Sequence, residues 1–368
     1  MRVVLSRWIG FVLLLAALPL VSSQFSVEAG PAESRLSPAN PLFDVEALAL
    51  KFVWRAELGS IGGDRLEALY PLGPYLLAET PDGEVHVLEA KTGSWQTMTR
   101  LRHGLSCGPA LSGNTILLIS NSRIYAFDTE TDQLSDATVT GFGQFADPLV
   151  FEDTVILGGA DGDIRSLTIE GRDEVWTAAV RGTIWEQPVV AGGNLYVAGS
   201  EALCLTPDTG LELWRWKPGK PSRLTAGVAA HGGTVFVGDD RGLVYGLDAE
   251  AGQPTWQTHM DSPVNALRIV QDRLLVFTGT PALVCLAASG ERQRLWSYAG
   301  AERLVGTADG TLYLQCTDGS LAAVSLAEGE ELWREPMPEG CLTAVHPAQP
   351  VLYVGNQEGT VAAFQKLD

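Results

Sequence analysis

The sequence contains few of the residues from which catalytic and metal sites are usually built. Its 368 residues include five histidines and five cysteines, and no CxxC, CxxCH or HExxH motif occurs. The cysteines are scattered singly, at Cys107, Cys204, Cys285, Cys316 and Cys341. These absences exclude the usual motifs for a dithiol centre, covalently bound haem and a zinc peptidase. An odd number of cysteines leaves at least one thiol unpaired within a monomer, and the sequence leaves open which residues pair.

Positive charge is also scarce. Acidic residues outnumber Lys and Arg by 44 to 25, which gives a formal net charge of −19. A chain this acidic repels phosphate backbones and anionic lipid surfaces, so nucleic acid is excluded as a partner. No apolar run after the N-terminal segment is long enough to span a bilayer. We therefore expect a monomer without an integral membrane span once that segment is removed.

The N-terminus has the form of an export signal. Arg2 and Arg7 flank the start of an apolar run, Trp8–Leu20, and small residues follow before Gln24. This order of charge, apolar run and small residues predicts a cleaved signal peptide over residues 1–23. The run is short for a membrane span, which needs about 20 residues, although an uncleaved anchor remains the alternative.

The residues that follow the signal predict where the exported protein resides. No cysteine precedes Cys107, so a lipid-bearing cysteine at the end of the signal is absent. We expect a periplasmic or extracellular protein that is not lipid-anchored. Residues 24–50, which are rich in Pro, Ser and Ala, are predicted to form a leader ahead of the folded domain.

Tryptophan marks an internal repeat with a period of about 40 residues. Six intervals separate seven tryptophans, and the single double interval holds a degenerate copy, Ala126–Asp132, with Asp136 in place of the tryptophan. The repeat tryptophans are Trp54, Trp95, Trp176, Trp214, Trp256, Trp296 and Trp333. We expect all seven to be structural, each packing over a glycine turn of its own or the neighbouring repeat.

Each repeat has the pattern of antiparallel strands joined by tight turns. In the fifth copy, Gly233–Gly238 and Leu243–Asp248 are short apolar runs separated by the turn Asp239–Gly242, and Gly252 and Trp256 follow. Short β-branched and aromatic runs between Asp-Gly and Gly-rich turns predict hairpins. Four such strands in about 40 residues are typical of one blade of a β-propeller.

The number of blades follows from counting the strand triplets. Eight triplets begin near Leu66, Pro109, Pro148, Pro188, Val228, Val264, Arg303 and Leu342. The last stops before any tryptophan, whereas Lys51–Leu58 is a tryptophan-bearing strand with nothing before it. The sequence thus predicts an all-β fold over residues 51–368, an eight-bladed propeller of four-stranded antiparallel blades. Its N-terminal strand completes the last blade and closes the ring.

The repeat resembles the PQQ-like (quinoprotein-type) family. The resemblance is carried by Gly246-Leu247-Asp248 with Gly252 and Trp256, and it recurs in two variants that end in Trp214 and Trp333. It implies one of two branches. One comprises quinoprotein dehydrogenases, which hold PQQ and calcium on the axis, and the other is non-catalytic and BamB-like. The fold does not choose between them.

The residues favour the non-catalytic branch. The quinoprotein branch is expected to have a disulfide between adjacent cysteines, and calcium takes six to eight oxygen ligands including carboxylates. This sequence has no adjacent cysteines, and its acids gather in hairpin turns, as at Asp82, Asp161, Asp163 and Asp318. We therefore expect no catalytic residues, no bound PQQ, no metal and a scaffold for a protein partner in the cell envelope. A PQQ- and calcium-dependent dehydrogenase and a carbohydrate- or cell-surface-binding propeller are the alternatives.

Basic residues gather in connections that are expected to lie on one face of the ring. One connection carries Lys217, Lys220 and Arg223 and contains no acid, and two earlier connections add further bases. The candidate partner-binding residues are Arg100, Arg102, Arg181, Trp185, Lys217, Lys220 and Arg223, with Trp216 as a second aromatic anchor expected to cover its own strand. An acidic or extended peptide would suit this face, although a solvated basic rim explains the same pattern.

Overall fold

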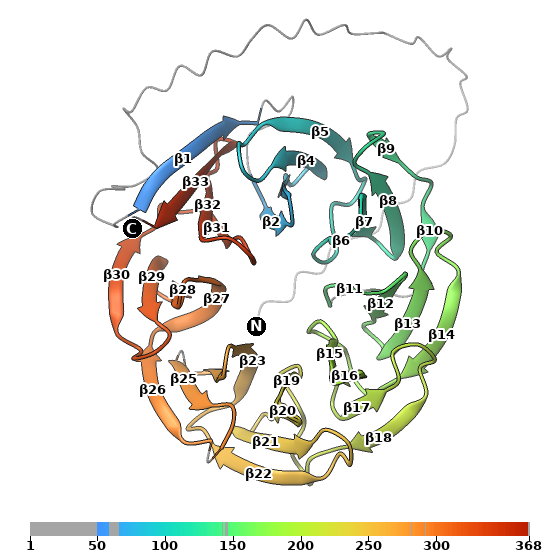
Figure 1. Cartoon of the computed structure of the whole chain (residues 1–368), viewed down its shortest axis with the longest axis vertical. Coiled ribbons are helices and arrows are strands. Elements are labelled where there is room, and N and C mark those ends of the chain that lie inside the picture. The colour runs from blue at the N-terminus through green and yellow to red at the C-terminus, as the bar shows by residue number, and fades with distance from the viewer. Residues whose placement is uncertain are drawn as a thin grey trace, which may run out of the picture. The chain divides into compact units, whose positions relative to one another are not determined.

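The computed structural model describes residues 50–58, 66–141, 143, 146–280, 282–290 and 292–366. Within these ranges the chain forms strands, turns and connections, and no helix long and apolar enough to cross a membrane occurs. Eight sheets are arranged around a central axis as the blades of a propeller (Figure 1). The predicted eight-bladed all-β fold is confirmed. The predicted signal peptide and nearly all of the leader lie outside the described residues.

Each blade is an antiparallel sheet whose strands follow one another from the axis to the rim in chain order (Figure 1), except that β9 and β10 both pair with β8 in blade two and that β1 is the outermost strand of the last blade. Blades one to four consist of β2 (Ala68–Leu72), β3 (Tyr75–Glu79), β4 (Glu84–Glu89) and β5 (Trp95–Arg100); β6 (Ala110–Ser112), β7 (Thr115–Ser120), β8 (Arg123–Asp128), β9 (Gln133–Leu134) and β10 (Thr138–Val139); β11 (Leu149–Phe151), β12 (Thr154–Gly158), β13 (Asp163–Thr168) and β14 (Glu174–Ala179); and β15 (Val189–Ala191), β16 (Asn194–Ala198), β17 (Ala202–Leu205) and β18 (Glu212–Trp216).

Blades five to eight consist of β19 (Ala229–His231), β20 (Thr234–Gly238), β21 (Leu243–Asp248) and β22 (Pro254–His259); β23 (Val264–Val270), β24 (Arg273–Thr278), β25 (Ala282–Ala287) and β26 (Arg294–Ala299); β27 (Ala301–Ala308), β28 (Thr311–Cys316), β29 (Ser320–Ser325) and β30 (Glu331–Pro336); and β31 (Leu342–Val345), β32 (Val351–Gly355), β33 (Thr360–Lys366) and β1 (Leu50–Glu57).

The two ends of the described chain close the ring, as predicted. β1 pairs with β33 from Leu50 opposite Lys366 to Glu57 opposite Thr360. The seam between the last and first blades is further tied at His346, whose Nδ1 accepts a hydrogen bond from the amide of Ala348 (3.1 Å). The proton of this imidazole is therefore on Nε2, which donates to the carbonyl of Gly73 at 2.7 Å.

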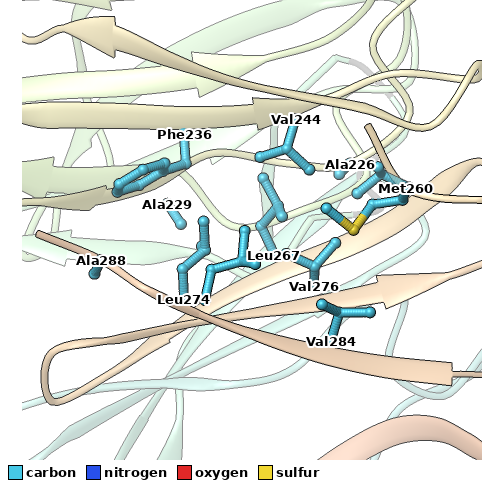
Figure 2. Packing of buried hydrophobic residues seen from close by; sticks show 12 residues of the cluster. Ala226, Ala229, Phe236, Val244, Met260, Leu267, Leu274, Val276, Val284 and Ala288 are labelled. Atoms are coloured by element: carbon cyan, nitrogen blue, oxygen red, sulfur yellow. The ribbon is translucent and has the colours of Figure 1, made fainter. Parts of the chain in front are cut away.

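The hydrophobic cores lie between neighbouring blades. Between blades five and six, Phe236 and Val244 pack against Leu274, Val276 and Val284 (Figure 2), and all five are buried. Burial of each such side chain contributes about 1.5–3 kcal/mol relative to exposure in water. Because the apolar faces of consecutive blades meet in this way, each blade is stabilised mainly by its neighbours.

At the rim, repeat tryptophans pack over a turn of the next blade and join the two blades. Trp214 of blade four lies over Gly252 of blade five, and its indole donates a hydrogen bond to the carbonyl of Ala249 at 2.9 Å. A Cβ at Gly252 would be 2.5 Å from the indole, so glycine is required there. The same arrangement joins Trp54 to Gly93, Trp176 to Gly210 and Trp296 to Gly329.

Trp95 does not make this contact, and its predicted packing was wrong. Its side chain is 57% exposed. In five other repeats the tryptophan stands four residues after a turn residue with positive φ, as Trp214 stands after Gly210. In blade one, Thr97 occupies that position, four residues after Gly93, and Trp95 stands two residues too early. The spacing of about 40 residues was too coarse to reveal this offset.

Two further tryptophans have other neighbours. Trp256 faces Arg292, whose guanidinium carbon lies 5.8 Å from the centre of the indole, so a cation–π contact replaces the glycine. Trp333 packs against Tyr313 of its own blade, with ring centres 6.0 Å apart. It has no turn to lie over, because the third and fourth strands of the last blade come from opposite ends of the chain.

Blade two has the degenerate repeat that the sequence predicts. Its outer strand is reduced to β9 and β10, and Asp136 stands four residues after Asp132, whose φ is 55°. The next blade compensates for the missing tryptophan with a polar contact. The guanidinium of Arg172 in blade three donates to the hydroxyl of Thr138 in blade two at 2.8 Å.

Candidate binding face

One face of the ring carries all the predicted partner-binding residues. We call it the loop face, and it comprises the connections between blades and the hairpins between the second and third strands of each blade. Lys217, Lys220 and Arg223 lie in the connection from β18 to β19, and Arg181 and Trp185 lie in the connection from β14 to β15.

The remaining two residues lie elsewhere on the loop face. Arg100 ends β5 and Arg102 follows it, in the connection to β6, three blades away from Arg223. Arg100 also lies near acids of its own blade, 3.3 Å from Glu84 and 3.9 Å from Asp82. The structure therefore does not bring Arg100 and Arg102 together with the other five.

A pocket of about 440 Å³ lies between the connections that enter blades four and five. We call it the loop-face pocket. Two predicted residues line it, Trp185, which is 62% exposed, and Arg223. The remaining lining residues are Gly182, Thr183, Glu186, Ala198, Gly199, Ser200, Leu224, Thr225, Ala226, Gly227 and Asp240. An exposed indole beside a guanidinium offers a partner both apolar contact and positive charge.

One wall of the pocket is held by a buried carboxylate. The side chain of Glu201 accepts hydrogen bonds from the backbone amide of Arg181 (3.2 Å) and from the guanidinium of Arg215. The carbonyl of Arg181 in turn accepts a bond from the amide of Ser200 at 2.6 Å. Arg215 also pairs with Glu212 at 2.8 Å. Its positive charge is therefore balanced by two carboxylates of the protein and is not offered to a partner.

The opposite wall is tied to the hairpin of blade five. The amide of Arg223 donates to the carboxylate of Asp240 at 3.1 Å, and the amide of Asp240 donates to the carbonyl of Arg223 at 2.9 Å. The Arg223 guanidinium lies 3.9 Å from the same carboxylate and its side chain is 77% exposed. A pair this exposed contributes little to stability, so the charge remains accessible to a partner.

The inner rim of the pocket is a contact that the sequence did not indicate. The side chain of Glu186 lies over Gly227, where a Cβ would collide with it, and its carboxylate pairs with Arg268 of blade six at 2.8 Å. The amide side chain of the next residue, Gln187, donates to the carbonyl of Pro148 at 2.7 Å. No pattern in the sequence pairs residues this far apart, so sequence reasoning missed this rim.

The second proposed anchor, Trp216, lies outside the pocket lining. Its ring packs against Tyr245 on β21 of the next blade, with ring centres 4.9 Å apart. That it covers its own strand stays a prediction, and the contact with Tyr245 shows that the ring also reaches the next blade. Trp185 and Arg223 therefore remain as the core of the candidate site, with Lys217 and Lys220 in the same connection as Arg223.

The described residues contain neither a cluster of potential metal ligands nor an activated thiol. Within them no three His, Cys, Asp or Glu side chains gather in a group that could hold a metal ion. All five cysteines are unpaired, and burial raises the pKa of Cys107 and of Cys285 to about 12. Thiols with such a pKa carry almost no thiolate at neutral pH. The side chains present thus do not fit a calcium–quinone site flanked by a disulfide.

A Gly-x-Ser-x-Gly pattern, Gly104–Gly108, lies in the connection from β5 to β6. The nucleophile elbow of hydrolases with this motif joins a strand to a helix. Here the pattern joins two strands, and the Ser106 hydroxyl accepts a hydrogen bond from the amide of Asn121 at 2.9 Å. The segment therefore lacks the context in which the motif supplies a nucleophile.

Eight antiparallel blades, seven of which carry a tryptophan on the outer strand, define a PQQ-like repeat β-propeller. The chain belongs to the family of outer membrane protein assembly factor BamB, whose family model matches residues 45–203, 198–270 and 268–368.

Curated relatives agree with this membership. The BamB protein of Burkholderia pseudomallei (strain K96243) is 25% identical over 315 residues, which are 81% of this chain and 71% of that protein. The Yersinia pestis BamB protein is also 25% identical, over 77% of this chain but only 60% of its own length.

The structure of BamB from Moraxella catarrhalis matches with a TM-score of 0.68 and 18% identity, over 86% of this chain and 97% of that one. Quinohemoprotein alcohol dehydrogenase from Comamonas testosteroni matches with a TM-score of 0.66 and 14% identity, over 88% of this chain and 77% of that one. At these identities the two structures show a shared fold alone.

Proposed function

We propose that this protein is a non-catalytic scaffold that binds a protein partner in the cell envelope. The observation that carries the proposal is the loop-face pocket, where Trp185 and the exposed Arg223 are presented between two connections fixed by hydrogen bonds. Preformed walls reduce the entropy lost on binding. Family membership supports the same role, because the relatives are outer membrane protein assembly factors.

The proposed location is outside the cytoplasm. The N-terminal segment has the composition of an export signal, and the relatives act on outer membrane proteins according to their names. That the protein carries no lipid remains a prediction from the position of Cys107, the first cysteine.

The partner surface proposed here is acidic or extended. Lys217, Lys220 and Arg223 supply three positive charges within one connection, and Arg223 lines the pocket together with Trp185. Replacing the three bases with Glu should abolish capture of envelope proteins by the purified, tagged protein while the unfolding midpoint stays unchanged. The matched control reverses Arg100 and Arg102, three blades away, and should leave capture intact. Capture that persists in the triple variant contradicts the proposal.

We infer that neither PQQ nor a metal takes part in this function. A direct test mixes the purified protein with PQQ and calcium and follows the quinone absorbance and alcohol oxidation. We expect neither a bound quinone spectrum nor turnover. Turnover would replace the scaffold proposal with the dehydrogenase alternative. Among the described residues that line the loop-face pocket, the indole of Trp185 is the one aromatic surface on which a sugar ring could stack.

A further inference from the structure

A second concave site lies on the opposite face of the ring. We call this the turn face, since it carries the hairpins between the first and second strands of each blade and the turns before the outer strands. A groove of about 420 Å³ lies between the inner hairpins of blades six, seven and eight. We call it the turn-face groove, and its lining includes Ile269, Val270, Ala308, Asp309, Leu326 and Ala348.

The floor of the groove is apolar. Val270 and Leu326 belong to the core between blades six and seven, and Ala308 packs against the core between blades seven and eight. Leu326 is buried, whereas Val270 and Ala308 are half-buried and reach the groove. The hydrophobic core between blades six and seven and that between blades seven and eight therefore both reach the turn-face groove. The groove has the size of a small-ligand or side-chain pocket.

The walls are held in place by backbone hydrogen bonds. The amide of Leu326 donates to the carbonyl of Gly310 at 2.9 Å, and the amide of Val351 donates to the carbonyl of Gln349 at 2.8 Å. The hairpin of blade eight is also anchored by His346, which bonds to Gly73 of blade one. The groove is thus formed before any partner arrives.

The charged side chains on the blade-seven side of the groove are acidic, whereas Arg273, which pairs with Val270 in the hairpin of blade six, is basic. Asp309 is its single charged lining residue, and Glu328 and Glu330 follow Leu326 in the adjacent turn. In the part of the chain that the structure describes, none of these three exposed carboxylates forms an ion pair. An apolar floor with unpaired carboxylates at its edge is complementary to an apolar side chain flanked by cations.

We propose that the turn-face groove binds an extended peptide segment in which a leucine-sized side chain is flanked by Lys or Arg. The leucine-sized side chain fills the floor at Val270, Ala308 and Leu326, and a flanking cation pairs with Asp309. This site is separate from the loop-face pocket and has the opposite charge preference. The ring then holds two partners at once, one on each face.

The test uses two fluorescent peptides, Arg-Leu-Pro-Leu-Arg and Glu-Leu-Pro-Leu-Glu, and measures anisotropy against the full-length protein. The basic peptide should bind saturably and at least about tenfold more tightly than the acidic one, and added salt should weaken it. Equal affinity for both peptides, or no saturation with the basic peptide up to about 1 mM, overturns the proposal.

Three variants locate the binding. Ala348→Trp fills the groove from an exposed position and should abolish saturable binding, and Ala348→Arg should do so by repulsion. Asp309→Asn keeps a residue that tolerates positive φ and should weaken binding about two- to fivefold. Lys220→Glu, on the other face, is the control and should bind the basic peptide as the wild type does. Wild-type affinity in both Ala348 variants, with unchanged unfolding midpoints, contradicts the assignment.

Discussion

Glu186 and Arg268 form a 2.8 Å ion pair although the first residue precedes blade four and the second lies in the inner strand of blade six. Between the two ends of this ion pair, the side chain of Glu186 lies over Gly227, which precedes blade five. One carboxylate thus links three blades next to the loop-face pocket, and it follows Trp185 directly in the chain.

The strength of this link is measurable by a double-mutant cycle. Both side chains are partly exposed, so the coupling between Glu186→Ala and Arg268→Ala should be about 0.5–1 kcal/mol in urea unfolding. It should decrease in 1 M salt, since screening weakens exposed pairs. Additive effects of the two substitutions would show that the pair contributes nothing.

The rim tryptophans should differ sharply in their contribution to stability. Trp214→Ala removes a buried indole and its hydrogen bond to Ala249, and should lower the free energy of unfolding by about 3–5 kcal/mol. Trp95→Ala, in the same repeat family, removes an exposed indole and should change it by less than about 0.5 kcal/mol. Comparable losses in urea denaturation would mean that the offset of Trp95 has been misjudged.

The turn glycines allow a matched comparison of strain and steric contact. Gly192 and Gly252 have φ of 58° and 68°, so Ala at either position costs about 1–2 kcal/mol of backbone energy. At Gly192 a Cβ meets nothing within 4 Å, whereas at Gly252 it meets the Trp214 indole. Gly252→Ala should therefore destabilise the protein by a clearly larger amount, measured as the shift in unfolding free energy. Equal shifts would remove the steric argument.

Stability should fall on mild acidification because of His86. Burial lowers the pKa of this imidazole below its usual 6.5, against the opposing effect of Glu84, whose carboxylate lies 3.6 Å away. Well above pH 6.5 the imidazole is neutral in both states and contributes no pH dependence. As the pH falls below 6.5, the unfolded chain binds a proton that the folded chain binds less readily, so the free energy of unfolding decreases.

Urea titrations between pH 7.5 and pH 5 would test this, with His86→Leu as the reference. Among the described residues, neither ring nitrogen of His86 has a hydrogen-bond partner, and Glu84 keeps its ion pair with Arg100 when Leu replaces the imidazole. As the pH falls, the free energy of unfolding of the wild type should decrease relative to that of His86→Leu. A difference that is independent of pH contradicts the prediction.

The repeat made most of the fold predictable. Gly-rich turns and short apolar runs recur in nearly every blade, and they predicted eight four-stranded sheets and the closure by Lys51–Leu58. The error at Trp95 arose because repeat spacing was used in place of the distance from the turn. Counting four residues from Gly93 leads to Thr97, as it leads from Gly210 to Trp214.

The candidate site was less predictable, because its parts come from separate blades. The sequence located Trp185 and Arg223 individually, but 38 positions separate them, and only the ring places their connections side by side. Nor does the sequence show that Arg215, two residues before Lys217, is already bound by Glu201 and Glu212. Partners of this kind have no periodicity, so no local pattern distinguishes an engaged arginine from an exposed one.

Because β1 closes the ring by pairing with β33, the last blade can be completed only after β33 has been synthesised. Glu57 in β1 accepts a hydrogen bond from Thr360 in β33, 303 positions later in the chain. Because chains are synthesised from the N-terminus, β1 emerges first and its partner strand last. For the whole of synthesis the Trp54 strand has no sheet to join, and contacts of such long range form slowly. A chain cut short before β33 therefore lacks the last blade's third strand and also leaves its first-made strand without a partner.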